Sequence, residues 1–394
     1  MYQKTKELEL ETLFVHGGEH PDPLTGALAP VLIRSKTYKQ PEFGKKARWE
    51  YARGQNPTRS LLEEKLAALE GRGYASVFSS GLAAETMIFM TLLPGDNIII
   101  PKEVYGGTLR LFNNIFVPYG INYSQTDFSS ENNIEQAIMP KTKYMFIEAL
   151  TNPSLNVIDL SLMQKVSEKT SIPFIADMTF SPTCSIRAFE YGAKAIVQSL
   201  SKYISGHNDV IGGAIITEDP ILNEKLKFLQ KTVGAILSPD ECYRTIQGIK
   251  TLHLRWDYVS KSALEVAQYL ESHEKVARVL YPGLSSHPSH KIAQKQMKNS
   301  FGGVLSFELA PMKAESMLKA FVDAVQARNT ITYGESLASP ETLLAYPCTM
   351  SHGSLSDKEK ETCGISKRFF RLSLGFESPR DIIADLEQAL QLIS

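Results

Sequence analysis

The sequence predicts an α/β protein with a mostly parallel sheet in a large domain, followed by a smaller C-terminal α+β domain. From about residue 56 to 245, short apolar runs alternate with helical patterns, and the runs lack the polar alternation of half-exposed strands. A long helical pattern at 251–272 then precedes strands and helices in no regular order. The 394 residues also exceed the size of one ordinary core.

The first 55 residues are predicted to form an arm. They contain little periodic pattern and several turn signals, such as His16-Gly17-Gly18 and Pro21-Asp22-Pro23. Such a segment is typical of an extension that crosses a neighbouring surface. We therefore expect an arm at 1–55, a large domain at 56–250 and a C-terminal domain at 251–394.

The large domain is predicted to hold strands at 75–80, 97–101, 143–149, 172–178, 195–199 and 212–217, with helices such as 60–70 and 160–169 between them. Strands of this kind form a parallel sheet that helices cover on both faces. The C-terminal domain is predicted to follow its long helix with strands at 303–309 and 370–374 and helices at 313–324 and 380–392.

Composition excludes several classes of protein. Basic and acidic residues number 42 and 43, whereas nucleic-acid and anionic-membrane partners favour a basic excess. No apolar run approaches the roughly 18 residues of a membrane span, and the N-terminus lacks the apolar core of a signal peptide. The four cysteines form no C-x-x-C pair. We expect a cytoplasmic protein with no disulfide framework and no metal site.

Three predicted strand ends place polar groups at one edge of the sheet, where ligands of parallel sheets gather. Asp177 ends one apolar run, Lys202 follows another, and Ser79-Ser80-Gly81-Leu82 joins a strand to a helix. A single lysine is usually solvated, and a single aspartate usually caps a helix. Together they supply a lysine imine, an acid for a pyridine nitrogen and a phosphate cup at a helix N-terminus. Pyridoxal 5′-phosphate requires this set.

Further motifs follow along nearly the whole chain. Their order and spacing resemble those of the Cys/Met-metabolism family of pyridoxal-phosphate (PLP) enzymes, the trans-sulfuration group of fold type I. The motifs are Tyr51-Ala-Arg53, Asn56-Pro57-Thr58-Arg59, Tyr105-Gly106-Gly107-Thr108, Thr151-Asn152-Pro153, Gly206-His207-x-Asp209, Tyr281-Pro282-Gly283-Leu284, Glu335-Ser336-Leu337 and Arg371-Leu372-Ser373.

The resemblance implies roles for residues around the cofactor. Lys202 would bind PLP as a Schiff base and shuttle protons, and Asp177 would pair with the pyridinium nitrogen. Tyr105 would stack on the ring, and Asn152 would hydrogen-bond its 3′ oxygen. The other implied cofactor ligands are Ser80, Gly81, Leu82, Thr179, Ser199 and Ser201, together with Tyr51 and Arg53, which in the family reach the phosphate of a neighbouring subunit. Tyr51 and Tyr105 join Lys202 as implied catalytic residues.

The substrate carboxylate would be clamped by Arg371 with Ser336 beside it, a task suited to a planar, two-pronged donor. The charges at Glu50, Arg110 and Glu335 resemble the pattern of cystathionine γ-synthases and γ-lyases. An acid pair there would suit the distal ammonium of cysteine or cystathionine. In methionine γ-lyases the third position is typically apolar, and in β-lyases it is aromatic. The alternative is that these three charges are solvated or pair with one another.

The resemblance thus implies γ-elimination or γ-replacement on cystathionine or O-acyl-L-homoserine. Alternatives are a methionine γ-lyase, an O-acetylhomoserine sulfhydrylase-type enzyme with another nucleophile, a fold-type I aminotransferase, and an idle PLP-binding paralogue. The shared arm implies a homodimer with common active sites, and the family's habit a homotetramer. Departures from the family pattern are expected near the pocket entrance, at Val31, Arg34, Lys36, Met178 and Ala338-Ser339.

Overall fold

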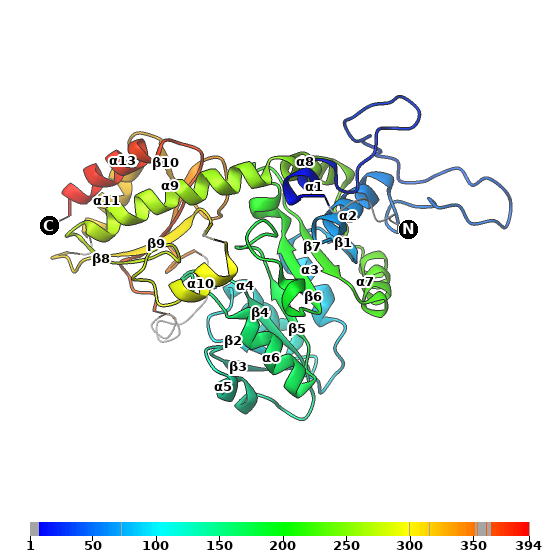
Figure 1. Cartoon of the computed structure of the whole chain (residues 1–394), viewed down its shortest axis with the longest axis horizontal. Coiled ribbons are helices and arrows are strands. Elements are labelled where there is room, and N and C mark those ends of the chain that lie inside the picture. The colour runs from blue at the N-terminus through cyan, green and yellow to red at the C-terminus, as the bar shows by residue number, and fades with distance from the viewer. Residues whose placement is uncertain are drawn as a thin grey trace.

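The chain folds around two sheets, each with its own helices (Figure 1). The computed structural model describes residues 8–71, 73–298, 300–314, 316–350, 353, 360 and 364–393. Helix α9, Leu252–Ser272, leads from the seven-stranded sheet to the five-stranded one. This arrangement confirms the predicted α/β architecture with a smaller second sheet.

The large sheet has the order β1 (Tyr74–Phe78), β7 (Gly213–Thr217), β6 (Ala195–Ser199), β5 (Phe174–Asp177), β4 (Thr142–Glu148), β2 (Asn97–Pro101) and β3 (Asn122–Thr126). Strand β7 runs antiparallel to both of its neighbours, and the other neighbouring pairs are parallel. The sheet is therefore mostly parallel, as predicted.

Both faces of this sheet are buried. On β2, Ile99 belongs to one hydrophobic core, whereas Ile98 and Ile100 belong to another on the opposite face. The covering helices and helical turns are α2 (Pro57–Leu69), α3 (Gly81–Phe89), α4 (Gly106–Leu111), η1 (Phe112–Phe116), α5 (Glu131–Gln136), α6 (Leu160–Thr170), η2 (Ala188–Tyr191), η3 (Leu200–Ile204), α7 (Pro220–Val233) and α8 (Pro239–Lys250). Because the inner strands of the sheet are buried on both faces, their sequences show continuous apolar runs, whereas the edge strand β3 is polar.

The sheet of the C-terminal domain has the strand order β10 (Ile331–Tyr333), β11 (Thr342–Ala345), β12 (Phe369–Ser373), β9 (Val304–Leu309) and β8 (Val276–Leu280). The helices of this domain are α10 (His290–Gln296), α11 (Ser316–Gln326) and α13 (Pro379–Gln391). Helix α11 begins and ends slightly later than the predicted 313–324. Strands β3, β8, β10 and β11 were not predicted.

The N-terminal region divides into two parts. Helix α1, Leu10–His16, lies within the predicted arm, but it packs on the large domain, and its Phe14 is fully buried against the ring of His253. From Gly18 to Asn56 the chain has only one β-bridge, Thr37 to Tyr51, and projects from the body in two long loops (Figure 1). Residues 1–7 of the predicted arm lie outside the described residues.

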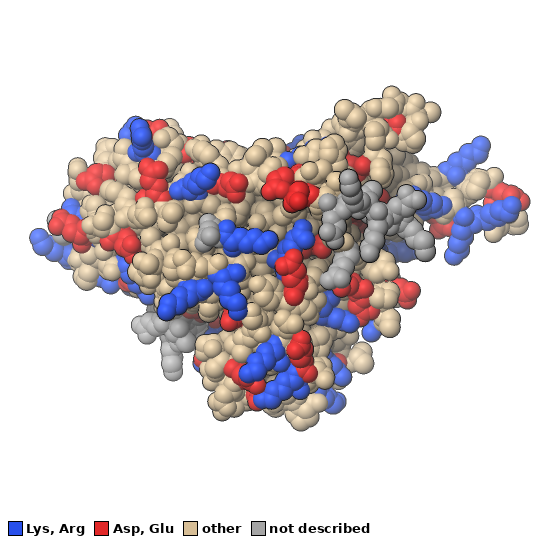
Figure 2. Space-filling model, viewed as in Figure 1, with Lys and Arg blue, Asp and Glu red and all other residues tan. Residues whose placement is uncertain are grey.

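The surface carries both signs of charge. On the face in Figure 2, acidic and basic side chains are interspersed, as the near-zero net charge leads us to expect. Among the described helices, none combines the length and apolar character that crossing a membrane requires.

Candidate active site

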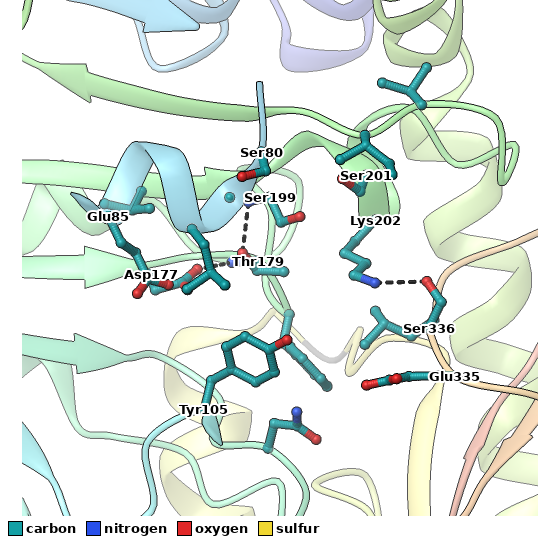
Figure 3. Close-up of a pocket in the computed structure, with 18 of the residues that line it drawn as sticks. Ser80, Glu85, Tyr105, Asp177, Thr179, Ser199, Ser201, Lys202, Glu335 and Ser336 are labelled. Atoms are coloured by element: carbon teal, nitrogen blue, oxygen red, sulfur yellow. Dashed lines mark hydrogen bonds between the residues drawn. The ribbon is translucent and has the colours of Figure 1, made fainter. Parts of the chain in front are cut away.

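A pocket of about 730 Å³ lies at the carboxyl ends of β4, β5 and β6 and is closed on one side by the C-terminal domain. Most residues that the sequence singled out line it. These are Ser80, Gly81, Leu82, Tyr105, Asn152, Asp177, Thr179, Ser199, Ser201, Lys202, Glu335, Ser336 and Arg371. Figure 3 shows side chains from both domains directed into this space.

Lys202 lies on η3, directly after β6. Its backbone departs from helical geometry, with φ −104° and ψ −131°. Buried Arg255 joins this segment to α8. Its guanidinium donates to the carbonyl oxygen of Tyr203 at 2.8 Å and to that of Gly248 on α8 at 2.7 Å. A Cβ at Gly206, where φ is +65°, would lie 1.8 Å from the Arg255 guanidinium, so this turn requires glycine.

The amine of Lys202 faces the cavity and donates to Oγ of Ser336 at 2.7 Å (Figure 3). Burial, together with the positive charge of Arg371, lowers the pKa of Lys202 to about 8, against the opposing charge of Glu335. About a tenth of the amine is therefore neutral at pH 7, far more than for a solvated lysine, and the neutral amine is the nucleophile.

Arg371, on β12, is 2% exposed. Its Nη1 donates to Oδ1 of Asn152 at 2.8 Å, and its Nη2 donates to the carbonyl oxygen of Ser336 at 2.9 Å. Among the described residues, the buried Nε has no hydrogen-bond partner. Burial lowers the pKa of Arg371 to about 10. A fixed buried cation with an unpaired donor is suited to an anionic ligand group.

One end of the pocket is built from the N-terminus of α3. Ser80 caps this helix by accepting from the Ala83 amide at 3.0 Å, and the first amides of a helix have no intrahelical partner. A Cβ at Gly81 would lie 3.0 Å from Cβ of Ser199, so the loops approach closely there. The hydroxyl of Ser201 accepts from the Gly212 amide at 3.0 Å. Amides and hydroxyls at a helix N-terminus are suited to a phosphate.

Asp177 ends β5 and faces the same cavity. Its Oδ1 accepts from the Thr179 amide at 2.8 Å, and Oγ1 of Thr179 accepts from the Ser199 amide at 2.8 Å. These bonds fix the carboxylate relative to the neighbouring strand β6. Burial raises the pKa of Asp177 to about 6, although the bonds from Thr179 act in the opposite direction.

Two buried glutamates that the sequence reasoning missed also line the pocket. Glu148 ends β4 and accepts from the Tyr105 amide at 2.5 Å, while Glu85 on α3 accepts from Oγ1 of Thr108 at 2.7 Å. The sequence signal was a single charged residue in each of two apolar runs, GLAAETMIF and YMFIE.

Four predicted site residues do not line this pocket: Glu50, Tyr51, Arg53 and Arg110. Tyr51 is 48% exposed on the arm, and Arg53 donates to the carbonyl oxygen of Lys231 at 2.7 Å. Arg110 is exposed on α4, where its charge opposes the rise that burial causes in the pKa of Tyr105. Within one chain, the arm residues and the pocket are thus apart.

The departures expected near the pocket entrance differ in their placement. For Met178 the expectation was wrong, because this side chain is 1% exposed and packs in the core of the large domain. Arg34 pairs with Asp240 at 2.5 Å, beside the pocket-lining Glu241. The Ala338 amide donates to Oγ of Ser373 at 2.8 Å. Within the described part of the chain, no three metal-ligating side chains gather in a cluster.

Comparison with known proteins gives one family. Residues 11–391 match the family described as Cys/Met metabolism PLP-dependent enzyme. The chain belongs to this family. It is 38% identical over 387 residues to a cystathionine beta-lyase of Coxiella burnetii, with 98% of each chain covered. It is also 38% identical over 383 residues to a cystathionine gamma-synthase of Mycobacterium leprae, covering 97% of this chain and 96% of that one.

Solved structures agree. A cystathionine gamma-lyase from Lactobacillus plantarum, complexed with L-serine, superimposes with a TM-score of 0.93 at 36% identity. The superposition covers 98% of this chain and 99% of that one. The Cys/Met metabolism enzyme described here therefore has the fold type I architecture and depends on PLP, and it is of the trans-sulfuration lyase or synthase class.

Proposed function

We propose that this pocket binds PLP through Lys202 and that the enzyme catalyses γ-elimination or γ-replacement on cystathionine or an O-acyl-L-homoserine. The pocket supports each part of the cofactor. Lys202 would hold the aldehyde carbon, Asp177 the ring nitrogen, and Tyr105 and Asn152 the ring face and its 3′ oxygen. The phosphate would be held by the Gly81 and Leu82 amides and by the Ser199 and Ser201 hydroxyls, and Ser80 and Thr179 would be further cofactor contacts. Bound PLP supplies an electron sink for cleavage at the substrate Cα.

Arg371 would bind the α-carboxylate of the substrate. Its buried Nε leaves one donor available, while the bonds to Asn152 and Ser336 hold its plane in place. Once displaced from the cofactor, the amine of Lys202 would accept the Cα proton. Loss of a second proton, at Cβ, would then expel the γ-substituent, which would leave with the electrons of its bond to Cγ. Because the pKa of Lys202 is lowered to about 8, the neutral amine that accepts a proton and the charged amine that donates one are both present near pH 8.

The observation that carries the choice of reaction is Glu335. Its carboxylate lines the pocket next to Ser336, and Figure 3 shows it below Lys202 and Ser336, across the pocket from Tyr105. Its charge acts on both of those side chains. A carboxylate there would pair with the distal ammonium of cystathionine or cysteine, which substrates with an apolar end lack. This supports a γ-lyase or γ-synthase over a methionine γ-lyase.

The test is to identify the 2-oxo acid that the purified enzyme forms from L-cystathionine. Cleavage on the γ side yields 2-oxobutyrate and cysteine, whereas cleavage on the β side yields pyruvate and homocysteine. We expect 2-oxobutyrate, or cystathionine when an O-acyl-L-homoserine and cysteine are supplied. Glu335→Gln should raise KM for cystathionine at least about tenfold. Pyruvate as the main product would contradict the γ assignment, and efficient cleavage of methionine would favour the methionine γ-lyase alternative.

A second copy of the chain is part of this proposal. Tyr51 and Arg53 project on the exposed arm, and exposed apolar side chains such as Leu24, Leu28 and Phe43 lie on the same segment. Bare apolar groups of this kind indicate a covering partner. We therefore assign Tyr51, Arg53 and Glu50 to the pocket of a neighbouring subunit in a homodimer, with a homotetramer as a pair of such dimers.

Complementation between subunits tests this assignment. Arg53→Ala and Lys202→Ala should each be inactive alone. Co-refolded in equal amounts, they should regain about a quarter of wild-type activity, because half of the dimers would hold one intact pocket out of two. Lys202→Ala co-refolded with Arg371→Ala is the matched control. Both residues belong to the pocket of their own chain, so each pocket of a mixed dimer lacks one of them and no activity should return. Recovery in the control equal to that in the test pair, or a monomer in sedimentation, would contradict the shared site.

A further inference from the structure

Glu85 is a buried acid of the pocket to which the proposed chemistry gives no task. It lies on α3, one turn after the helix begins, and is 3% exposed. Figure 3 shows it next to Asp177, at the end of the pocket opposite Lys202. Both side chains line the same cavity.

The position of the Glu85 carboxyl is fixed by the neighbouring helix. Oγ1 of Thr108, itself fully buried, donates to Oε2 of Glu85 at 2.7 Å. Thr108 lies three residues after Tyr105, whose amide donates to Glu148. Two buried glutamates, Glu148 on β4 and Glu85 on α3, therefore hold the turn that carries Tyr105.

Within the described part of the chain, no cation balances this group of acids. Glu85, Glu148 and Asp177 form no ion pair there; their partners are the Thr108 and Thr179 hydroxyls and backbone amides. Burying several carboxyls without a cation is costly unless they take up protons or a ligand brings positive charge. Burial, together with the nearby charge of Asp177, raises the pKa of Glu85 to about 8, against the opposing hydrogen bond from Thr108.

We propose that Glu85 is a positioning residue that strengthens the hold of Asp177 on the proton of the cofactor's ring nitrogen. The inference rests on the proposed function, because the positive partner is the ring nitrogen of PLP. A protonated nitrogen next to Asp177 would favour the charged form of Glu85, and by linkage a charged Glu85 favours the protonated nitrogen. The titratable groups that act on this pair from the surrounding elements are Glu148 on β4 and Tyr105 at the start of α4.

Glu85→Gln is the sharpest variant. Glutamine keeps an oxygen that can accept from Thr108 and has the same shape, so it removes the charge and leaves the packing. The readout is nitrogen NMR of the holoenzyme loaded with PLP that is isotopically labelled at the ring nitrogen, recorded as a function of pH. We expect the ring nitrogen of the variant to lose its proton about one pH unit lower than in the unsubstituted enzyme, a tenfold change in proton affinity.

Glu70→Gln is the matched control. Glu70 is also a buried glutamate, and burial raises its pKa to about 7, but it lies outside the pocket. This variant should titrate like the unsubstituted enzyme. A second readout is affinity for the PLP analogue with carbon in place of the ring nitrogen. Glu85→Gln should weaken binding of PLP several-fold more than binding of this analogue.

If Glu85→Gln fails to fold, Thr108→Val decides, because loss of the hydroxyl favours the neutral glutamate and should shift the ring nitrogen in the same direction. An unchanged titration in the variant that folds, or an equal shift in Glu70→Gln, would overturn this inference alone. Failure of the unsubstituted protein to take up PLP would overturn the proposed function and this inference with it.

Discussion

The Lys202 amine donates to the Ser336 hydroxyl at 2.7 Å across 134 positions of sequence. The same serine accepts from Arg371 through its carbonyl oxygen, so one residue of the C-terminal domain joins the lysine of the large domain to the buried guanidinium. Ser336 has a φ of +108°, in a region that side chains rarely adopt. The strain lies at the point where the two domains meet in the pocket.

This strain gives a prediction for stability. Ser336→Ala and Ser336→Gly both remove the hydroxyl, but only glycine relieves the backbone at φ +108°. We expect the glycine variant to be more stable than the alanine variant by about 1 kcal/mol in urea unfolding. Both should bind an amino-acid carboxylate more weakly than wild type. An alanine variant as stable as the glycine variant would show that the backbone here is unstrained.

The lowered pKa of Lys202 gives a prediction for reactivity. A lysine becomes nucleophilic when it loses its proton, and the folded-state pKa of about 8 lies below the ordinary value. Modification of Lys202 in the cofactor-free protein by an amine reagent, followed by mass spectrometry, should therefore rise with pH through a midpoint near 8. Glu335→Gln removes a charge that raises this pKa, so its midpoint should be lower.

Glu341→Gln is the control for that experiment. Glu341 is exposed, precedes β11 and does not line the pocket, so its substitution should leave the midpoint unchanged. A midpoint close to that of a solvated lysine in the wild-type protein would mean that neither burial nor Arg371 acts on Lys202.

The turn behind Lys202 gives a third prediction. Gly206→Ala would place a Cβ 1.8 Å from the guanidinium of Arg255, and Gly192→Ala, at a similarly positive φ of +80°, would meet nothing within 4 Å. Gly192→Ala should cost about 1 kcal/mol, for the backbone alone. Gly206→Ala should cost about 3 kcal/mol or more and weaken PLP retention, because Arg255 would lose its bonds to the η3 carbonyls. Equal costs would mean that the contact with Arg255 is easily relieved.

Much of the fold could be predicted because the strands of the large sheet are buried on both faces and so form continuous apolar runs. Strand β3 could not, because its sequence NYSQT is polar and lies at an exposed edge of the sheet. Strands β10 and β11 are only three and four residues long, too short for a periodic pattern.

The pocket residues at strand ends, Asp177 and Lys202, could be predicted because parallel strands share one carboxyl edge. The contribution of Ser336 and Arg371 came only from the resemblance, since no local pattern fixes how two domains pack. Glu85 and Glu148 were missed because a charged residue in an apolar run is ordinarily taken as the exposed end of an element. Met178 was misplaced because alternate residues of a strand face opposite sides.

The most direct test of the central claim is to reduce the PLP-loaded enzyme with borohydride and locate the attached cofactor by peptide mass spectrometry. We expect one phosphopyridoxyl group per chain, on Lys202, and none on the Lys202→Ala variant. Attachment at another lysine, or cofactor released intact after reduction, would contradict it.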